Sequence, residues 1–230
     1  MPRVSVLMPV FNCESYIGSA IESVLNQSFQ DFELIVVNDG STDRSGEIAS
    51  SYPSVRYFER PHGGIPKTRN FALSKAEGEL IAFLDADDMW TPEKLEHQVR
   101  YLDLHPECDI IFCRYKNFTD ISENEMTERQ EKLLGREIDK CLTAACMRRT
   151  LFARVGYFSL TCPYGEDTEW SARLVLAGVD ISKRLEEFLY LRRIHGDNIT
   201  LSHNDSDNNA FYTSLADSIR KKLRRGGRVR

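Results

Sequence analysis

The stretch Leu80–Asp88 reads Leu-Ile-Ala-Phe-Leu-Asp-Ala-Asp-Asp, so an apolar run ends abruptly in three carboxylates within four positions. The apolar part has the length and composition of a buried strand. Carboxylates crowded at the end of such a strand repel one another and resist desolvation unless a cation lies among their oxygens. Mg²⁺ and Mn²⁺ prefer hard oxygen ligands and share them readily with phosphates. The stretch therefore predicts a metal-bridged phosphate substrate at the end of a buried strand.

Strand-like and helix-like segments alternate around this stretch in the first half of the chain. The expected strands cover residues 4–8 (closed by Pro9), 32–37, 55–58 and 80–84, and the expected helices cover residues 17–25, 45–50 and 66–75, with another starting at Thr91-Pro92. This order predicts an α/β fold with a mostly parallel sheet and helices on both faces. Ligands of such sheets bind beyond the carboxyl ends of the strands. Asn12, Asp39 and the carboxylates of residues 85–88 each follow a strand, so they are expected to converge.

The second half of the chain has a less regular pattern. Strands are expected over residues 110–115, 181–185 and 188–192, and a helix over residues 168–177. The polar residues 120–140 predict a mobile loop or an exposed helix. Because no break in composition precedes residue 205, residues 1–205 are expected to form one domain, followed by a basic helix or tail over residues 206–230.

Composition limits the class of protein. The chain has 230 residues, 41 % hydrophobic content and a formal net charge of −5, so it can bury a sizeable core and is no electrostatic match for nucleic acid. No apolar run reaches the roughly 18–20 residues of a bilayer-spanning helix, and the N-terminus lacks a signal-peptide pattern, so a cytoplasmic location is expected. The six cysteines form no Cys-x-x-Cys pair and are expected to be reduced thiols. The basic tail suits peripheral contact with an anionic membrane surface, or simply solvent.

Five blocks of the sequence resemble family 2 glycosyltransferases, in the same order along the chain. They are Val4–Asn12 with Glu14, Glu33–Asp43, Gly63–Asp88, Tyr164–Asp167 and Tyr190–His195. The resemblance implies a GT-A fold, a nucleotide-sugar donor, Mn²⁺ or Mg²⁺, and inversion at the anomeric carbon. It also implies that residues 1–105 bind the donor and that residues 106–205 carry the acceptor side and the catalytic base.

The resemblance places Pro9, Asn12 and Asp39 at the nucleobase end of the donor. An aspartate suits this place because it accepts a hydrogen bond from a base N–H, although Asn-Asp-Gly is also an ordinary turn. Glu14 either binds the base or ribose or favours a helix N-terminus. Arg69 is expected to face the nucleotide, where a guanidinium binds phosphate or stacks on a base.

The carboxylates of residues 85–88 are expected to surround the sugar diphosphate. The resemblance gives Asp87 the direct metal contact and gives Asp85 the ribose or a metal-bound water, and the metal neutralises the leaving diphosphate. Asp88 either touches the transferred sugar or supports the site structurally. His195 completes the metal shell, binds the diphosphate or is structural.

Glu166 and Asp167 are the candidates for the catalytic base. An inverting displacement needs one carboxylate to accept the proton of the acceptor hydroxyl on the face opposite the leaving group. Asp167 is the first candidate, the alternative being a plain helix-capping residue. Glu166 is its partner, an acceptor ligand or the base itself, and spacing does not decide between the two.

The leading hypothesis is an inverting glycosyltransferase that uses a UDP-sugar, with GDP and dTDP donors open, in surface polysaccharide or glycolipid synthesis. Its acceptor would be a saccharide or a lipid-linked molecule. A nucleotidyltransferase is a second hypothesis, although its usual Gly-rich basic loop does not follow the first strand. A non-catalytic sugar-nucleotide-binding module is a third, although such a module is expected to have lost the carboxylates that Asp85, Asp87 and Asp167 retain.

Overall fold

The computed structural model describes residues 1–122, 125–134, 141–161, 165–196 and 198. The basic segment predicted over residues 206–230 lies outside this part of the chain. Within the described ranges, no helix is both long enough and apolar enough to cross a membrane.

Helices and strands alternate along the first half of the chain, as predicted, with bounds that differ by one or two residues at most elements. Part of the polar segment expected as a loop or exposed helix forms the short helix α5. In chain order the elements are β1 (Val4–Val10), α1 (Ile17–Leu25), β2 (Phe32–Asn38), α2 (Ser45–Ser50), β3 (Val55–Glu59), α3 (Ile65–Lys75), β4 (Leu80–Phe83), β5 (Met89–Trp90), α4 (Lys94–Leu104), β6 (Ile110–Phe118), α5 (Glu128–Leu134), η2 (Leu142–Ala144), β7 (Ala145–Arg148), α6 (Thr150–Val155), α7 (Glu166–Leu176) and β8 (Arg184–Arg193).

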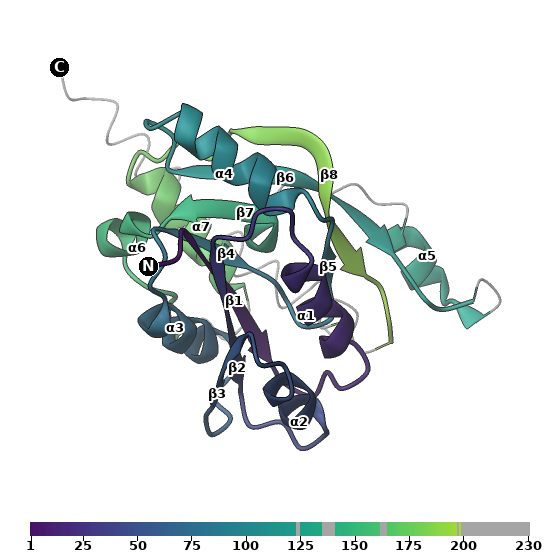
Figure 1. Cartoon of the computed structure of the whole chain (residues 1–230). Helices are drawn as coiled ribbons and strands as arrows, with labels where there is room; N and C mark the ends of the chain where they lie inside the picture. Colours follow the sequence, from purple (N-terminus) through teal and green to yellow (C-terminus); the bar gives the residue numbers. More distant parts are fainter. Residues whose placement is uncertain (123–124, 135–140, 162–164, 197, 199–230) are drawn as a thin grey trace.

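The strands of the described ranges form one eight-stranded sheet in the order β3-β2-β1-β4-β7-β6-β8-β5 (Figure 1). The first four strands in this order are mutually parallel, so β1, β2 and β4 end at the same edge of the sheet. β7 runs antiparallel between β4 and β6, while β8 runs parallel to β6 and antiparallel to β5. The predicted α/β fold is confirmed, and each antiparallel pair among the described strands includes β7 or β8, from the second half of the chain.

Helices cover both faces of the sheet, as predicted. α1, α2 and α4 pack on one face, against side chains such as Val6 and Met8 of β1. α3, α6 and α7 pack on the other face, against Leu7 of β1, Ile35 of β2 and Phe83 of β4. Successive side chains of a strand point to opposite faces, so each central strand supplies both cores. This double burial explains why the strands read as continuous apolar runs.

Pro9 lies inside β1 and does not end it, contrary to the prediction. The carbonyls of Arg3 and Leu7 accept hydrogen bonds from the N–H groups of Leu80 and Leu84, so the odd-numbered residues of β1 face β4. The pairing between β1 and β4 stops at Leu7. Pro9 has no N–H to donate the next bond on that side, so the ladder with β4 ends before it, while β1 continues against β2 as far as Val10.

Thr91 does not cap α4, which begins three residues later at Lys94. The N–H of Thr91 donates instead to the carbonyl of Leu189 in β8, and its own carbonyl accepts a bond from Gln27 Nε2. The chain before α4 therefore continues the edge pairing of β5. The Thr-Pro pattern marks the approach to the helix and not its first turn.

The two strands expected between residues 181 and 192 are one strand, β8. Arg184 pairs with Phe112 of β6, and Phe188 pairs with Arg114, so four residues of β8 advance against two of β6. This irregularity accommodates two exposed glutamates within a continuous strand. The gap between the two expected strands is therefore a bulge within β8.

Glu33 ties together the amino ends of the central strands. Its carboxylate accepts hydrogen bonds from Ser5 Oγ (2.5 Å) and from the N–H of Glu77 (2.7 Å), and it pairs with Arg56 of β3. Burial alone would raise the pKa of Glu33, but these hydrogen bonds and the arginine outweigh it and lower the pKa below 4.5. The ionised form is therefore the one that stabilises the fold.

Glu33→Gln should lower the free energy of unfolding by about 1–2 kcal/mol at pH 7, because the variant loses the ion pair with Arg56. A carboxyl whose pKa is lowered by folding stabilises the protein above its unfolded pKa and loses that effect as pH falls through the folded pKa. The difference between wild type and variant should thus shrink below pH 4.5. Urea unfolding at several pH values measures it, and a difference that is equal at pH 7 and pH 3 would contradict the assignment.

Candidate functional site

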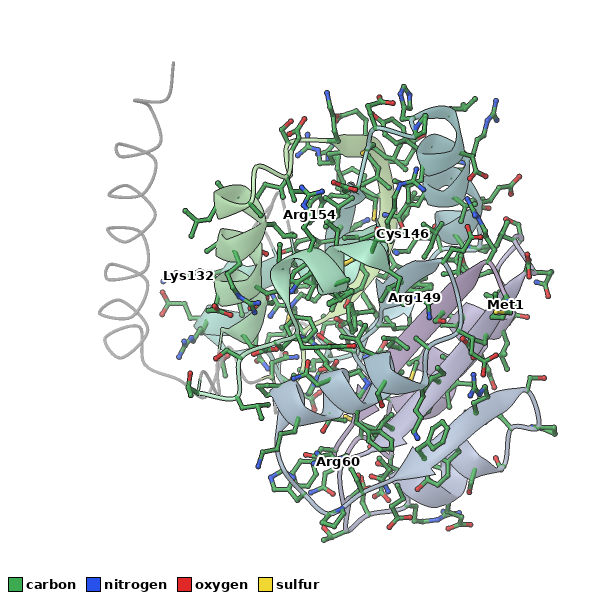
Figure 2. All side chains as sticks on the ribbon, turned by 90° about the vertical axis from the view of Figure 1, so that its left-hand side faces the viewer. Met1, Arg60, Lys132, Cys146, Arg149 and Arg154 are labelled. Carbon is green, nitrogen blue, oxygen red and sulfur yellow. The ribbon has the colours of Figure 1, made fainter. Side chains whose placement is uncertain are left out.

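The predicted site residues gather at the carboxyl edge of the sheet. Asp39 follows β2, the carboxylates of residues 85–88 follow β4, and His195 follows β8. Glu166 and Asp167 begin α7, which packs beneath β4. Figure 2 shows Arg60 beside α3, at the edge opposite the one where Met1 lies. The expected convergence of residues that follow strands is therefore present in the structure.

Asp39 is buried and anchors the segment between β3 and α3. Its carboxylate accepts hydrogen bonds from Arg60 Nη1 (2.5 Å) and from the N–H groups of Gly63 (3.1 Å) and Gly64 (2.7 Å). Gly64 has a φ of 87°, which leads into the first turn of α3. His62 Nδ1 lies 3.0 Å from Asp39 Oδ2. The carboxylate thus shapes the loop at the predicted nucleobase end.

An exposed aromatic pair lies beside Asp39, and the sequence alone did not single it out. The rings of Phe11 and His62 stack with centroids 4.2 Å apart, and Phe11 is 44 % exposed. Such flat, accessible faces suit stacking with a nucleobase. The only sequence signal was the position of Phe11 directly after the first strand.

Asn12 and Glu14 hold the loop after β2. Asn12 has a φ of 51°, and its Oδ1 accepts a hydrogen bond from the N–H of Thr42 (2.9 Å). Glu14 Oε2 accepts a bond from the N–H of Arg44 (2.9 Å), directly before α2. Both side chains are thus placed among the residues that surround Asp39. Of the two expectations for Glu14, this contact corresponds to the helix N-terminus.

Arg69 lies inside the protein and contacts carboxylates. Its Nη2 donates to Asp85 Oδ1 (2.9 Å) and its Nη1 donates to Glu166 Oε1 (2.5 Å). The guanidinium also lies over the rings of Phe83 and Phe158. Burial alone would lower the pKa of Arg69, but the surrounding carboxylates raise it. The guanidinium is therefore a fixed cation between the carboxylates of Asp85 and Glu166.

The carboxylates around this arginine are crowded. Burial raises the pKa of Asp85 and of Glu166, Arg69 opposes that effect, and neighbouring carboxylates add to it. Glu166 is nearly enclosed, with 6 % of its side chain exposed, against 39 % for Asp85. Asp167 is half-buried, and its Oδ1 accepts a bond from the N–H of Thr168 (2.7 Å). Asp167 is therefore the more accessible carboxylate of the pair at the start of α7.

Asp87 and His195 form the second pair of the site. His195 Nε2 lies 3.0 Å from Asp87 Oδ2, and Asn198 Nδ2 lies 3.5 Å from the same oxygen. The ring of Tyr16 stacks on the imidazole with centroids 4.5 Å apart. A carboxylate and an imidazole are donors that Mn²⁺ accepts. Among the described residues, no group of three His, Cys, Asp or Glu side chains is arranged to hold a metal.

Asp88 is buried and accepts hydrogen bonds from two residues of β8. Tyr190 donates its hydroxyl to Asp88 Oδ2, and the N–H of Arg193 donates to Oδ1 (2.7 Å). Burial, with Asp87 and Asp85 nearby, raises its pKa well above 3.8. Asp88 thus joins the turn after β4 to β8.

Arg193 is a further residue of the site that pattern reading did not identify. Its Nε donates to the carbonyl of Asp87 (3.0 Å), and its guanidinium pairs with Asp120. The same group lies 4.6 Å from the ring centroid of Phe118 and 5.1 Å from that of Tyr16. Arg193 therefore fixes the backbone that carries Asp87. Its only sequence signal was its place two residues before His195.

Comparisons with known proteins agree with this arrangement. The family model described as Glycosyl transferase family 2 matches residues 5–161. An uncharacterized glycosyltransferase of Rickettsia typhi is 30 % identical over 208 residues, which make up 84 % of this chain and 64 % of that protein.

Solved structures share the architecture. The structure of S. aureus TarS 1–349 in complex with UDP matches with a TM-score of 0.67 and 26 % identity, over 84 % of this chain and 61 % of that one. The mannosyltransferase PcManGT from Pyrobaculum calidifontis, in complex with GDP-Man and Mn²⁺, matches with a TM-score of 0.67 and 19 % identity, over 87 % of this chain and 59 % of that one. The expected GT-A fold is thus confirmed, and the chain spans less than two thirds of the length of each protein compared.

Proposed function

The chain belongs to glycosyl transferase family 2, and on that basis we propose that it moves a sugar from a nucleoside diphosphate to an acceptor hydroxyl with inversion. One observation carries the proposal. Asp87 with His195 lies at the end of β4, and Asp167 begins α7, with the Asp85–Arg69–Glu166 bridge between them. Such a site offers donor-binding groups and an accessible carboxylate together. UDP is the proposed nucleotide, because TarS, a solved structure of 26 % identity, binds it.

We place the donor along the carboxyl edge of the sheet. Its nucleobase would lie near Pro9, Asn12 and Asp39, against the exposed aromatic pair of Phe11 and His62. Because the Asp39 carboxylate already accepts several bonds within the chain, its main contribution would be the shape of this end. Glu14 would act here through its hold on the loop before α2.

The diphosphate would lie beyond β4. Asp87 and His195 would hold Mn²⁺ or Mg²⁺ directly, Asp85 would bind a water on the ion, and the diphosphate oxygens would supply the remaining ligands. When bound, the metal supplies positive charge against the leaving diphosphate. Asp88 would serve only as structural support.

Asp167 is the proposed base. The reaction needs a carboxylate that can reach the acceptor hydroxyl and take its proton. Glu166 is enclosed and bonded to Arg69, whereas Asp167 is half-buried next to it at the start of the same helix. We therefore assign proton transfer to Asp167 and support of the site to Glu166.

The other hypotheses are less well supported. Membership of this family disfavours a nucleotidyltransferase. A non-catalytic binding module is disfavoured by the retained carboxylates, and measured turnover would exclude it. The acceptor, a saccharide or a lipid-linked molecule, stays open, as do the cytoplasmic location and the membrane contact through residues 206–230.

A screen of nucleotides tests the donor. UDP with Mn²⁺ at about 100 times its Kd should stabilise the chain by about 2.7 kcal/mol, which raises Tm by about 5–10 °C. GDP and dTDP with Mn²⁺ should raise Tm less, and UDP with EDTA should have little effect. Differential scanning fluorimetry measures these shifts. The same Tm with and without each of the three nucleotides would contradict the proposal.

A further inference from the structure

We propose that Arg69 is a positioning residue, which sets the start of α7 and its base Asp167 against the donor-side carboxylate Asp85. This inference rests on the proposed function and deepens it. It differs from the expectation that Arg69 itself contacts the nucleotide.

The two ion pairs of Arg69 join the donor side of the site to the acceptor side. Asp85 follows β4, and Glu166 is the first residue of α7, 81 positions later in the chain. One guanidinium bonds to both, at 2.9 Å and 2.5 Å. A planar guanidinium presents its donors in a fixed fork, so the positions of the two carboxylates depend on each other. Because Asp167 is the next residue after Glu166, the bridge also fixes the base.

The surroundings of Arg69 leave it little room to bind the donor directly. Only 5 % of its side chain is exposed. Its Nε is buried and has no hydrogen-bond partner among the residues that the structure describes, and the rings of Phe83 and Phe158 lie 5.6 Å and 5.9 Å from the guanidinium carbon. Both terminal nitrogens already serve carboxylates. A diphosphate would have to reach a guanidinium that is nearly closed off from solvent and already paired with two carboxylates.

The neighbouring residue of α3 makes a second connection to the same region. Asn70 Nδ2 donates to the carbonyl of Phe158 (2.9 Å), and the N–H of Phe158 donates back to Asn70 Oδ1 (3.0 Å). Trp170 of α7 bonds through Nε1 to the carbonyl of Gly156 in the same loop (2.9 Å). Helix α3 thus holds α7 at two places: at Glu166, the first residue of α7, and at the loop that precedes α7. Loss of Arg69 alone would leave Asn70 in place but would leave Glu166 as a buried, unpaired charge.

The test compares four variants of the whole chain. Arg69→Met removes both ion pairs, and Arg69→Lys keeps a cation that can reach only one carboxylate. Arg69→Met combined with Glu166→Gln removes the buried charge that Arg69→Met leaves unpaired. Lys75→Met is the matched control, because Lys75 is a second cation of α3 that lies over two rings, Phe58 and Phe71.

Two measurements separate positioning from donor binding. Hydrogen exchange followed by mass spectrometry reports on residues 169–173 of α7, and calorimetry reports the affinity for UDP with Mn²⁺. Arg69→Met should speed exchange in α7 at least about tenfold while UDP affinity stays within about threefold. Arg69→Lys should have a smaller effect, the double variant should restore part of the protection, and Lys75→Met should match wild type. Turnover should be lowest in the variant whose α7 exchanges fastest, and highest in the variants whose α7 exchanges as slowly as in wild type.

Unchanged exchange in α7 for Arg69→Met and for Arg69→Lys would overturn the proposal. So would a loss of UDP affinity of tenfold or more with α7 still protected, because Arg69 would then be a donor ligand. If Arg69→Met does not fold, the exchange of Arg69→Lys against Lys75→Met decides. Failure of the wild-type chain to bind UDP, GDP or dTDP would count against the proposed function, and the exchange data would still decide whether Arg69 holds α7.

Discussion

Asp167→Asn should retain UDP binding with Mn²⁺ and lose sugar transfer by a factor of about 10²–10⁴. The amide has nearly the same shape as the carboxylate but cannot take the proton of the acceptor hydroxyl. Its Oδ1 can still accept the bond from the N–H of Thr168, so the helix start should be unaffected. Calorimetry with UDP and a coupled assay of UDP release measure the two properties separately.

Glu169→Gln is the matched control for this variant. Glu169 lies on the same helix and pairs with Arg173, so its loss perturbs α7 without removing the proposed base. The control should keep turnover within about threefold of wild type. If Asp167→Asn keeps near-normal turnover, another group is the base, and Glu166 would be tested next.

Asp87→Ala should abolish metal-dependent binding of the donor, with a loss of UDP affinity of at least about a hundredfold in the presence of Mn²⁺. Asp87 is the proposed carboxylate ligand, and His195 alone would hold the ion weakly. The variant should bind UDP equally with Mn²⁺ and with EDTA. Calorimetric titrations under both conditions measure this.

The control for Asp87→Ala is Asp103→Ala, which removes an exposed carboxylate that pairs with Arg3 away from the site. Its affinity for UDP with Mn²⁺ should equal that of wild type. Unchanged affinity in Asp87→Ala would count strongly against a metal-bridged diphosphate at the end of β4.

The sequence predicts the elements of this fold better than it predicts the partners of individual side chains. The apolar runs of β1, β2 and β4 and the helical spacing of α1 were readable because burial imposes a period on the residues themselves. Thr91 was misread because its backbone bonds to β8, a hundred residues away, which outweigh its local preference for a helix start. Pro9 does not end its strand because the pairing of β1 with β2 continues to Val10, and that pairing depends on a distant segment.

The same limit applies to the site. Convergence of Asn12, Asp39 and the carboxylates of residues 85–88 was predictable, since parallel strands share a carboxyl edge. Asp167 lies on a helix, so this rule did not place it, and only the family resemblance pointed to it. The enclosure of Asp88 by Tyr190 and Arg193 depends on β8, and no spacing rule reveals such a partner. Arg69 was expected to face the nucleotide, and no spacing rule reveals the two carboxylate partners that hold it inside the protein.

The way that β8 returns to the end of β4 has a consequence for dissecting or recombining this protein. The match to the family model ends at residue 161, yet Asp167 lies beyond it, and so do Arg193 and His195, which contact Asp87. A fragment cut after residue 161 would retain Asp85 and Asp87 but lose Arg193 and His195, which contact Asp87. A chimaera that exchanges only the matched region would join β4 to a foreign β8. A segment transferred to another protein has to include α7 and β8 together with β4. It therefore has to extend at least to residue 198, because Asn198 contacts Asp87.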